Sequence, residues 1–335
     1  MSPQAAHAGL ARAAAAALQA PWWMAGPHLQ TIVPARLLRV ARVAYRRERW
    51  ETPDGDFLDV DFALAEPAAQ HAPLLVLFHG LEGDSDAHYA RLVMQACLGR
   101  GWRAMVVHFR GCSGEPNRLP RAYHSGDSAE IDWVLERVAR RWPRARRFAV
   151  GVSLGGNALA KWAGERGAAA ARCIDAFVTV SAPFDLAAGG AALGRGFNRV
   201  YTFNFLLSLR RKALGKVAQF PGIADAARIR ASRTLYDFDD AFTAPVHGFD
   251  GVLDYWQRAS ARPWLAGVRL PMLALNAAND PFVPAASLPA PGELSASVQL
   301  EVPGEGGHVG FFYAKRGREP WYLRQRVVDF LARHL

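Results

Sequence analysis

One serine of this chain lies in a setting that could make it a nucleophile. Ser153 is the centre of G-V-S-L-G at 151–155, which follows the apolar run 147–152 and precedes the helical run 154–165. This context predicts a sharp strand-to-helix turn, in which small flanking residues let the backbone close around a strained serine. The helix N-terminus would add backbone N–H donors and a partial positive charge. The alternative is an ordinary glycine-rich turn between a strand and a helix, with no chemical role.

A nucleophilic serine needs a base, and the base needs an acid that orients it. Where the serine lies in such a turn, the chain order is serine, acid, histidine. Asp280 follows the apolar run 270–276, past the carboxyl end of an expected strand, where ligand sites of parallel sheets form. His308 lies in G-E-G-G-H-V-G at 304–310 and fits the order better than the other histidines. The alternative for Asp280 is a turn aspartate before a proline.

Backbone donors are needed where negative charge develops on the reacting carbonyl. The loop H-G-L-E-G at 79–83 follows an apolar run, where the second donor of such a site is expected. We therefore assign the N–H groups of Leu81 and Leu154 to this oxyanion hole, and we expect Gly80 to contact the substrate. His79 is expected to shape the loop by hydrogen bonding rather than to act as a base.

The segments that must position these residues alternate between strand-like and helical patterns. Strand-like runs lie at 40–52, 57–64, 74–78, 102–109, 147–152, 174–180, 270–276 and 297–302. Helical runs lie at 88–99, 125–141, 154–165 and 321–335. Unbroken apolar strands that alternate with helices predict an α/β protein with a doubly wound, mostly parallel sheet.

The alternation stops at about residue 184 and resumes near 265. Residues 184–264 are helical in pattern and rich in Phe, Leu and Arg, so we predict a helical cap or lid inserted into the α/β core. The core then comprises 41–183 and 265–335, and 1–40 is an N-terminal arm. The aromatic, proline-bracketed part of this arm, about 21–31, is predicted to be too irregular for a helix.

Within the insertion, Phe203 and Leu207 belong to an apolar series at near-helical spacing that continues to Leu214 and Val217, with basic residues interleaved from Arg210 to Lys216. We expect both side chains to contact the substrate. A lid that covers an acyl chain and transiently meets an anionic membrane surface fits this pattern, and so does a helix that packs on the core.

The net charge of +10 arises from 40 Lys and Arg against 30 Asp and Glu, but the basic clusters are short and interrupted. We therefore expect no nucleic-acid partner, and no obligate protein partner is evident. Cysteines and histidines lack metal-ligand spacing, so neither a metal nor another cofactor is expected. No apolar stretch is long enough to span a bilayer and no signal peptide is evident, which predicts a cytoplasmic protein.

The chain resembles one subfamily of α/β-hydrolases, the bacterial YheT-like hydrolases and the eukaryotic ABHD1- and ABHD3-type proteins. The matching segments are G-P-H-L-Q-T at 26–31, H-G-L-E-G at 79–83, F-R-G-C-S-G at 109–114, Y-H-S-G-D at 123–127, G-V-S-L-G-G-N at 151–157 and N-D-P at 279–281. The resemblance runs from about residue 20 to the C-terminus. It implies an α/β-hydrolase fold, a Ser-Asp-His triad and carboxylic-ester chemistry.

These observations together predict a serine hydrolase that cleaves carboxylic esters through an acyl-enzyme on Ser153. The expected substrates are small-molecule esters with short to medium acyl chains, or acylglycerol-type lipids. Three alternatives stay open: an alcohol O-acyltransferase with the same triad, an amide hydrolase, and a non-catalytic binding protein on this scaffold.

Overall fold

The strand-like runs pair into one eight-stranded sheet, in the order β1-β2-β4-β3-β5-β6-β7-β8. The computed structural model describes residues 19–64, 71–313 and 319–335. Its strands are β1 (Tyr45–Glu51), β2 (Phe57–Ala63), β3 (Leu74–Phe78), β4 (Arg103–Val107), β5 (Arg147–Val152), β6 (Ala176–Val180), β7 (Met272–Leu275) and β8 (Val298–Glu301). β2 is antiparallel to β1 and to β4, and every pairing from β4 to β8 is parallel.

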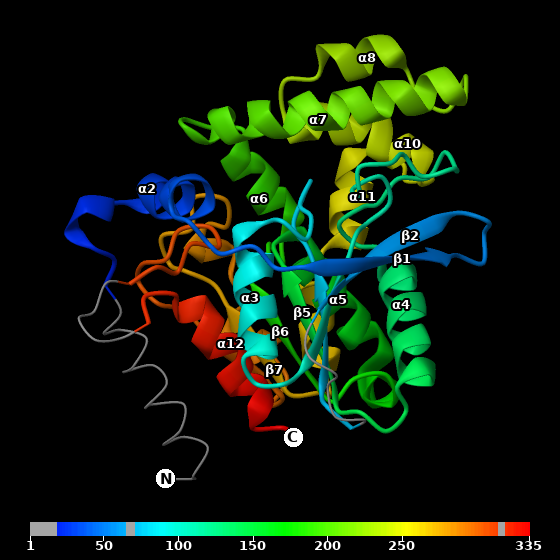
Figure 1. Ribbon diagram of the computed structural model, residues 1–335. Coiled ribbons are helices and arrows are strands. Elements are labelled where there is room, and N and C mark those ends of the chain that lie inside the picture. The colour runs from blue at the N-terminus through cyan, green and yellow to red at the C-terminus, as the bar shows by residue number, and fades with distance from the viewer. Residues whose placement is uncertain (1–18, 65–70, 314–318) are drawn as a thin grey trace.

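Helices cover both faces of this sheet (Figure 1). α3 (His88–Leu98) and α12 (Tyr322–Ala332) pack together on one face, and α4 (Ser128–Arg141) and α5 (Leu154–Arg166) pack together on the other. Side chains of one strand alternate between the two apolar cores, as Val76 and Leu77 of β3 do. Burial on both faces explains why the central strands read as unbroken apolar runs. The fold is the α/β-hydrolase fold that the sequence predicts.

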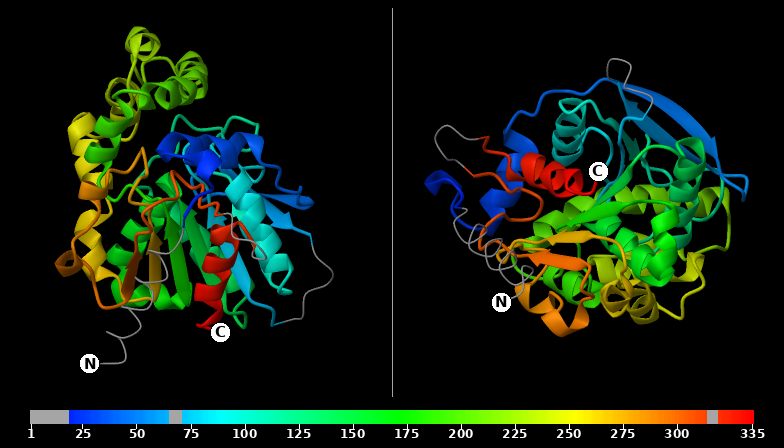
Figure 2. Two further views of the ribbon diagram at one scale, coloured as in Figure 1. Left: turned by 90° about the vertical axis from the view of Figure 1, so that its left-hand side faces the viewer. Right: turned by 90° about the horizontal axis from the view of Figure 1, so that it is seen from below.

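The stretch between β6 and η5 (Arg262–Gly267) contains helices and no strand, and these helices lie above the sheet (Figure 2, left). We call them the cap. They are α6 (Leu186–Leu193), α7 (Asn198–Gln219), α8 (Ala226–Ala231), α9 (Leu235–Phe238), the π-turn η4 (Asp239–Thr243), α10 (Ala244–Val246) and α11 (Val252–Ala259). Leu206 and Leu209 of α7 pack against Ile229 of α8 and Phe242 of η4. The cap therefore has an apolar core of its own.

Most of the segment 21–31 is helical, so the prediction that it is too irregular for a helix was wrong. A single turn, η1 (Trp22–Met24), is followed by α2 (Pro27–Ile32) and the π-turn η2 (Val33–Leu37). Pro27 is the first residue of α2, where its missing N–H removes no helical hydrogen bond. The proline therefore begins a helix here instead of preventing one. Residues 1–18 of the expected arm lie outside the described residues.

Short 3-10 helices of one or two turns complete the core. They are η3 (Gly167–Arg172), η5 (Arg262–Gly267), η6 (Ala285–Ser287) and η7 (Pro291–Glu293). Among the described residues, no helix combines the length and the apolar character needed to cross a bilayer.

Candidate active site

Ser153 occupies the turn between β5 and α5 in a strained backbone conformation. Its φ of 51° and ψ of −117° are values that a residue with a side chain rarely adopts. Its N–H donates to the carbonyl oxygen of Val180 on β6 over 2.8 Å, which ties the turn to the sheet. A side chain at Gly155 would not fit, because its Cβ would lie 2.5 Å from the carbonyl oxygens of Phe78 and His79. The glycine therefore lets the turn close with the Ser153 side chain toward the cap.

Asp280, His308 and Ser153 form one hydrogen-bonded chain. Nε2 of His308 lies 3.0 Å from Oγ of Ser153, and Nδ1 lies 2.9 Å and 3.1 Å from the two carboxylate oxygens of Asp280. The buried carboxylate also accepts the backbone N–H groups of Phe282 and Val283, which fix its orientation. With Nδ1–H donated to Asp280, Nε2 is left to accept the serine proton.

The N-terminal segment holds the loop that carries His308. The backbone N–H of His308 donates to Oγ1 of Thr31 over 2.9 Å, and the Thr31 hydroxyl donates to the carbonyl oxygen of Pro27. The N–H of Gly306 donates to Oε1 of Gln30, also over 2.9 Å. Gln30 and Thr31 are both buried, so these bonds are shielded from water.

Gln30 also contacts the loop that carries the acid. Asn279, the residue before Asp280, donates to Oε1 of Gln30 over 2.8 Å and accepts the N–H of Gly307 over 3.0 Å. We call Gln30, Thr31 and Asn279 the brace. The sequence assigns the brace no role, and the glycine-rich run 304–310 is its only local signal that another backbone segment comes close.

The two residues assigned to the oxyanion hole, Leu81 and Leu154, line the same cavity as Ser153 and His308. Leu154 is the first residue of α5, so its N–H has no acceptor within the helix. The N–H of Leu81 likewise has no acceptor in the part of the chain that the structure describes. Both donors are therefore available to a ligand.

Neighbours of Leu81 hold its loop in place. The N–H of Gly80 donates to the Tyr89 hydroxyl, and that of Glu82 donates to the Tyr123 hydroxyl, each over 2.9 Å. Below the loop, Nδ1 of the buried His79 lies 2.7 Å from the carbonyl oxygen of Gly80. Burial lowers the pKa of His79 to about 3, so the ring is neutral at pH 7. His79 thus shapes the loop, as the sequence predicts.

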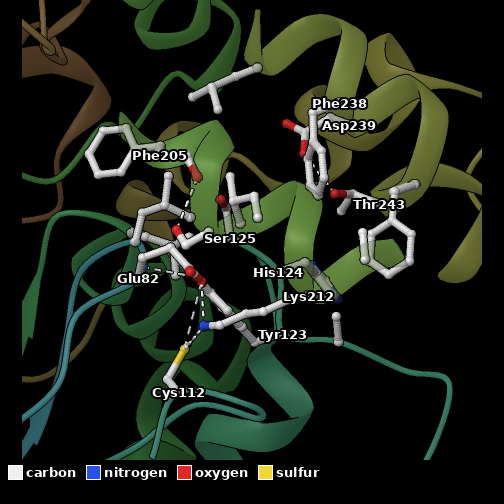
Figure 3. A pocket seen from close by; sticks show the side chains of 18 of the residues that line it. Glu82, Cys112, Tyr123, His124, Ser125, Phe205, Lys212, Phe238, Asp239 and Thr243 are labelled. Carbon is white, nitrogen blue, oxygen red and sulfur yellow. Dashed lines mark hydrogen bonds and ion pairs between the residues drawn. The ribbon is translucent and has the colours of Figure 1, made fainter. Parts of the chain in front are cut away.

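A cavity of about 770 Å³ lies between the cap and the Ser153 turn. Its volume falls in the range of small-molecule sites in proteins. Most of its wall is apolar, and the main contributors are Leu81, Leu186, Leu193, Phe205, Leu209 and Phe242. Phe205 projects from α7 in Figure 3. Ser153 and His308 therefore face a mainly apolar cavity, and the cap forms the wall opposite the Ser153 turn.

Phe203 and Leu207, which we expected to contact the substrate, do not line this cavity. Their side chains are 57% and 54% exposed, and α7 instead turns Phe205 and Leu209 inward. Helical spacing groups residues on a face but does not say which face turns inward. Gly80 is not a lining residue either, although a Cβ there would lie 3.2 Å from Cβ of Ser153.

A polar cluster joins the cap to the Leu81 loop at the cavity wall (Figure 3). Nζ of Lys212 on α7 lies 2.9 Å from Oε1 of Glu82, which also accepts the Tyr123 hydroxyl over 2.8 Å. Sγ of Cys112 lies 3.5 Å from the same Nζ. Burial raises the pKa of Cys112 to about 12, so its thiol stays protonated.

A second polar group, the Asp239 carboxyl, also lines the cavity. It accepts the Thr243 hydroxyl over 2.7 Å and Nε1–H of Trp256 over 2.8 Å. Burial raises the pKa of Asp239 to about 6. Across the described residues, no three His, Cys, Asp or Glu side chains form a group that could hold a metal ion.

Comparison with known sequences places this geometry among related proteins. The model of a family described as alpha/beta hydrolase fold matches residues 73–315. YheT of Escherichia coli (strain K12), whose name assigns it provisionally to the esterases, is 39% identical over 310 residues, covering 92% of this chain and 91% of YheT. Human phospholipase ABHD3 is 27% identical over 309 residues, and the match covers 90% of this chain and 75% of ABHD3.

The fold is shared with solved structures at lower identity. An esterase of Pyrococcus furiosus superposes with a TM-score of 0.54 at 16% identity, covering 90% of this chain and 99% of the esterase. At that identity the likeness concerns the fold alone.

Proposed function

This chain belongs to the alpha/beta hydrolase family and is a carboxylic ester hydrolase, and from that premise we propose that it cleaves acyl esters through an acyl-enzyme on Ser153. One observation carries the proposal: the hydrogen-bonded chain from Asp280 through His308 to Ser153 opens into a mainly apolar cavity. The distances are those at which a histidine takes a serine proton.

In the proposed first step, Oγ of Ser153 attacks the ester carbonyl carbon and its proton passes to Nε2 of His308. Asp280 accepts Nδ1–H and stabilises the imidazolium that forms. The carbonyl electron pair moves onto oxygen, where the N–H groups of Leu81 and Leu154 stabilise the oxyanion. When the intermediate collapses, the bond to the alcohol oxygen breaks and that oxygen takes the proton from Nε2.

The second step returns the enzyme to its starting state. Water donates a proton to Nε2 of His308 as its oxygen attacks the acyl-enzyme carbonyl. Collapse of this second intermediate releases the carboxylic acid, and Oγ of Ser153 recovers the proton from Nε2. An alcohol that replaced water would yield a new ester instead, so product analysis separates hydrolysis from acyl transfer.

The cavity supports a substrate with an apolar acyl group. Its mainly apolar wall offers an acyl chain burial from water, and its volume accommodates a small lipid. We therefore propose short- to medium-chain acyl esters or acylglycerol-type lipids as the substrate class. The name of the human relative, a phospholipase, agrees with a lipid ester.

The test is hydrolysis of p-nitrophenyl esters from acetate to palmitate, with and without an added alcohol. Ser153→Ala should lower kcat by roughly 10⁴-fold or more and abolish labelling by a fluorophosphonate. Ser125→Ala is the matched control, because Ser125 lines the same cavity but does not bond to His308. Labelling or turnover that survives in Ser153→Ala would rule out Ser153 as the nucleophile.

A further inference from the structure

The outer side of α7 and the residue before it carry an apolar stripe that the described chain leaves about half exposed. Phe197, Val200, Phe203 and Leu207 are 49%, 49%, 57% and 54% exposed. Their spacings of three, three and four residues place them along one side of the helix, while Leu206 on another side is fully buried. Exposed apolar residues that gather in one patch, rather than singly, mark an interaction site.

The stripe lies in a segment without a single acidic residue. Residues 186–224 contain no Asp or Glu, and their basic residues are Arg195, Arg199, Arg210, Arg211, Lys212 and Lys216. Lys212 pairs with Glu82, but no ion pair forms at the exposed Arg199 or Arg211 among the described residues. Arg199 lies between the first two stripe residues, and Arg211 lies one turn beyond Leu207.

The N-terminal segment adjoins the stripe and has the same character. The His28 ring lies 4.5 Å from the Phe197 ring, and Figure 1 shows α2 below the N-terminal end of α7. Trp22, Trp23 and Leu29 are exposed in this segment. Residues 19–47 contain no acidic residue. Tryptophan is enriched where proteins meet the boundary between lipid and water.

The cavity adjoins the stripe through α7 itself. Phe205, Ser208 and Lys212 line the cavity from one side of the helix, and the stripe runs along the next. Arg211 is exposed and also lines the cavity, so the two surfaces meet there. A lipid surface in contact with the stripe would therefore lie beside the cavity.

We propose that the α7 stripe, with Arg199 and Arg211, docks on an anionic lipid surface. The apolar side chains would enter the boundary between headgroups and acyl chains, while the two guanidinium groups pair with lipid phosphates. Charge complementarity and the four adjacent apolar side chains favour this occupant over a soluble acidic protein. Delivery of an ester from that surface into the cavity rests on the proposed function, but docking does not.

Flotation of the full chain with lipid vesicles tests the docking. Wild-type protein should bind vesicles of equal parts phosphatidylglycerol and phosphatidylcholine at low salt, and bind pure phosphatidylcholine about 10-fold less. The double variant Phe203→Ser with Leu207→Ser should bind the anionic vesicles at least about 10-fold more weakly. Arg199→Gln with Arg211→Gln should remove most of the preference for the anionic lipid, as should added salt.

The control is Leu253→Ser on α11. Leu253 is 64% exposed in the same cap but is followed by Asp254, so its loss should leave binding unchanged. The two serine variants should hydrolyse a dissolved short-chain ester at the wild-type rate, which shows that both remain folded. The Phe203/Leu207 variant alone should lose rate on an ester dispersed in anionic vesicles.

Three outcomes would overturn the proposal. They are no binding of wild type to the anionic vesicles, equal binding by the double variant, and a dimer in solution that the double variant abolishes while vesicles stay unbound. Ser153→Ala separates docking from catalysis, because it should bind vesicles as wild type does while it hydrolyses nothing. Binding without hydrolysis in wild type would contradict the proposed function and leave the docking intact.

Discussion

The His308 loop and the cap both border the cavity at Ser153, and the chain holds them by different means. The loop bonds through its backbone N–H groups to the buried side chains of Gln30 and Thr31. α7 of the cap meets the core through side chains, such as Lys212 on Glu82 and Asn198 on the carbonyl oxygen of Pro281. The side chains that hold the loop are buried, whereas Lys212 and Asn198 are partly exposed, so the contacts of α7 are less shielded from water.

This comparison suggests that the His308 loop and the cap have different roles in the site. The brace joins the acid loop and the base loop through one glutamine, so the spacing from Asp280 to His308 changes little. The cap borders the cavity over part of its inner surface and packs against the core elsewhere, where Leu193 meets Phe282 and Val283. On this view the His308 loop sets the reaction geometry and the cap adapts to the substrate. Each variant below tests whether the two sides differ in this way.

The largest effect is expected from Gly310→Ala. A Cβ at Gly310 would lie 1.9 Å from the backbone oxygen of Gln30, so either the loop or the brace must move. We expect the free energy of unfolding to fall by about 3 kcal/mol or more and most of the activity to be lost. Urea unfolding and ester hydrolysis measure both effects.

Gly304→Ala is the matched control for Gly310→Ala. Gly304 lies in the same loop, but a Cβ there would meet nothing within 4 Å. It should leave stability and activity close to wild type. Equal losses in the two variants would mean that any change to the loop is harmful, and that its contact with Gln30 has no special weight.

A smaller effect is expected from Thr31→Val, which removes the acceptor of the His308 N–H at nearly constant shape. The buried N–H left without a partner costs about 1–3 kcal/mol of stability. Because His308 then loses a fixed position, kcat should fall about 10-fold with KM little changed. Steady-state kinetics on a short-chain ester provides the measurement.

The control for Thr31→Val lies in the cap. Thr202 is also buried and donates its hydroxyl to the carbonyl oxygen of Leu193 over 2.7 Å. Thr202→Val should lower stability by a similar amount with kcat retained. If both variants lower kcat equally, the cap takes part in setting the reaction geometry and the proposed difference in roles is wrong.

Asp239→Asn tests whether burial of a carboxyl at the cavity weakens the cap. The pKa of Asp239 rises from 3.8 to about 6 on folding, so its contribution to stability is full below pH 4 and is lost as the pH rises through 6. Between pH 4.5 and pH 8, the free energy of unfolding of the variant should therefore rise by about 1–2 kcal/mol relative to that of wild type. This range allows for partial solvation of the Asp239 carboxyl by water in the cavity. Urea unfolding at the two pH values gives this difference, from which any pH-independent effect of the substitution cancels.

Asp250→Asn, which makes the same substitution in an exposed turn of the cap, serves as the control. An Asp239→Asn variant whose stability relative to wild type is the same at both pH values would mean that the Asp239 carboxyl is already ionised without penalty.

How far the sequence predicts these two regions depends on how local the pattern is. The apolar runs of β3 and β5 predict their strands to the residue, because burial on both faces makes each strand a continuous apolar run, apart from Arg147 at the start of β5. Chain order and strand ends bring Asp280 and His308 to Ser153, because parallel strands end at one edge of the sheet. The brace is not predictable in this way, since no local pattern shows which distant side chain will meet 304–310.

The rotation of α7 about its own axis illustrates a second feature that the sequence does not predict. Phe203 and Phe205 have the same chemical type and are two residues apart, yet only Phe205 lines the cavity. Their difference arises from tertiary packing, in which Leu206 and Leu209 meet Ile229 of α8 and fix the rotation of the helix. Periodicity alone leaves that rotation undetermined.

The smallest effect is expected from Lys212→Gln, which removes the ion pair between α7 and the loop of Leu81. Lys212 is about one-third exposed, so the pair contributes less than about 1 kcal/mol to stability. Tyr123 still bonds to both the N–H and the carboxylate of Glu82, so the oxyanion donor of Leu81 should keep its place and kcat should change less than about threefold.

Hydrogen exchange of Lys212→Gln should speed up in α7 and stay unchanged at 304–310, because only the cap has lost a contact with the core. Arg258→Gln, which breaks an exposed pair with Asp254 inside α11, should change neither segment. Faster exchange at both α7 and 304–310 in Lys212→Gln would show that the cap and the base loop open as one unit.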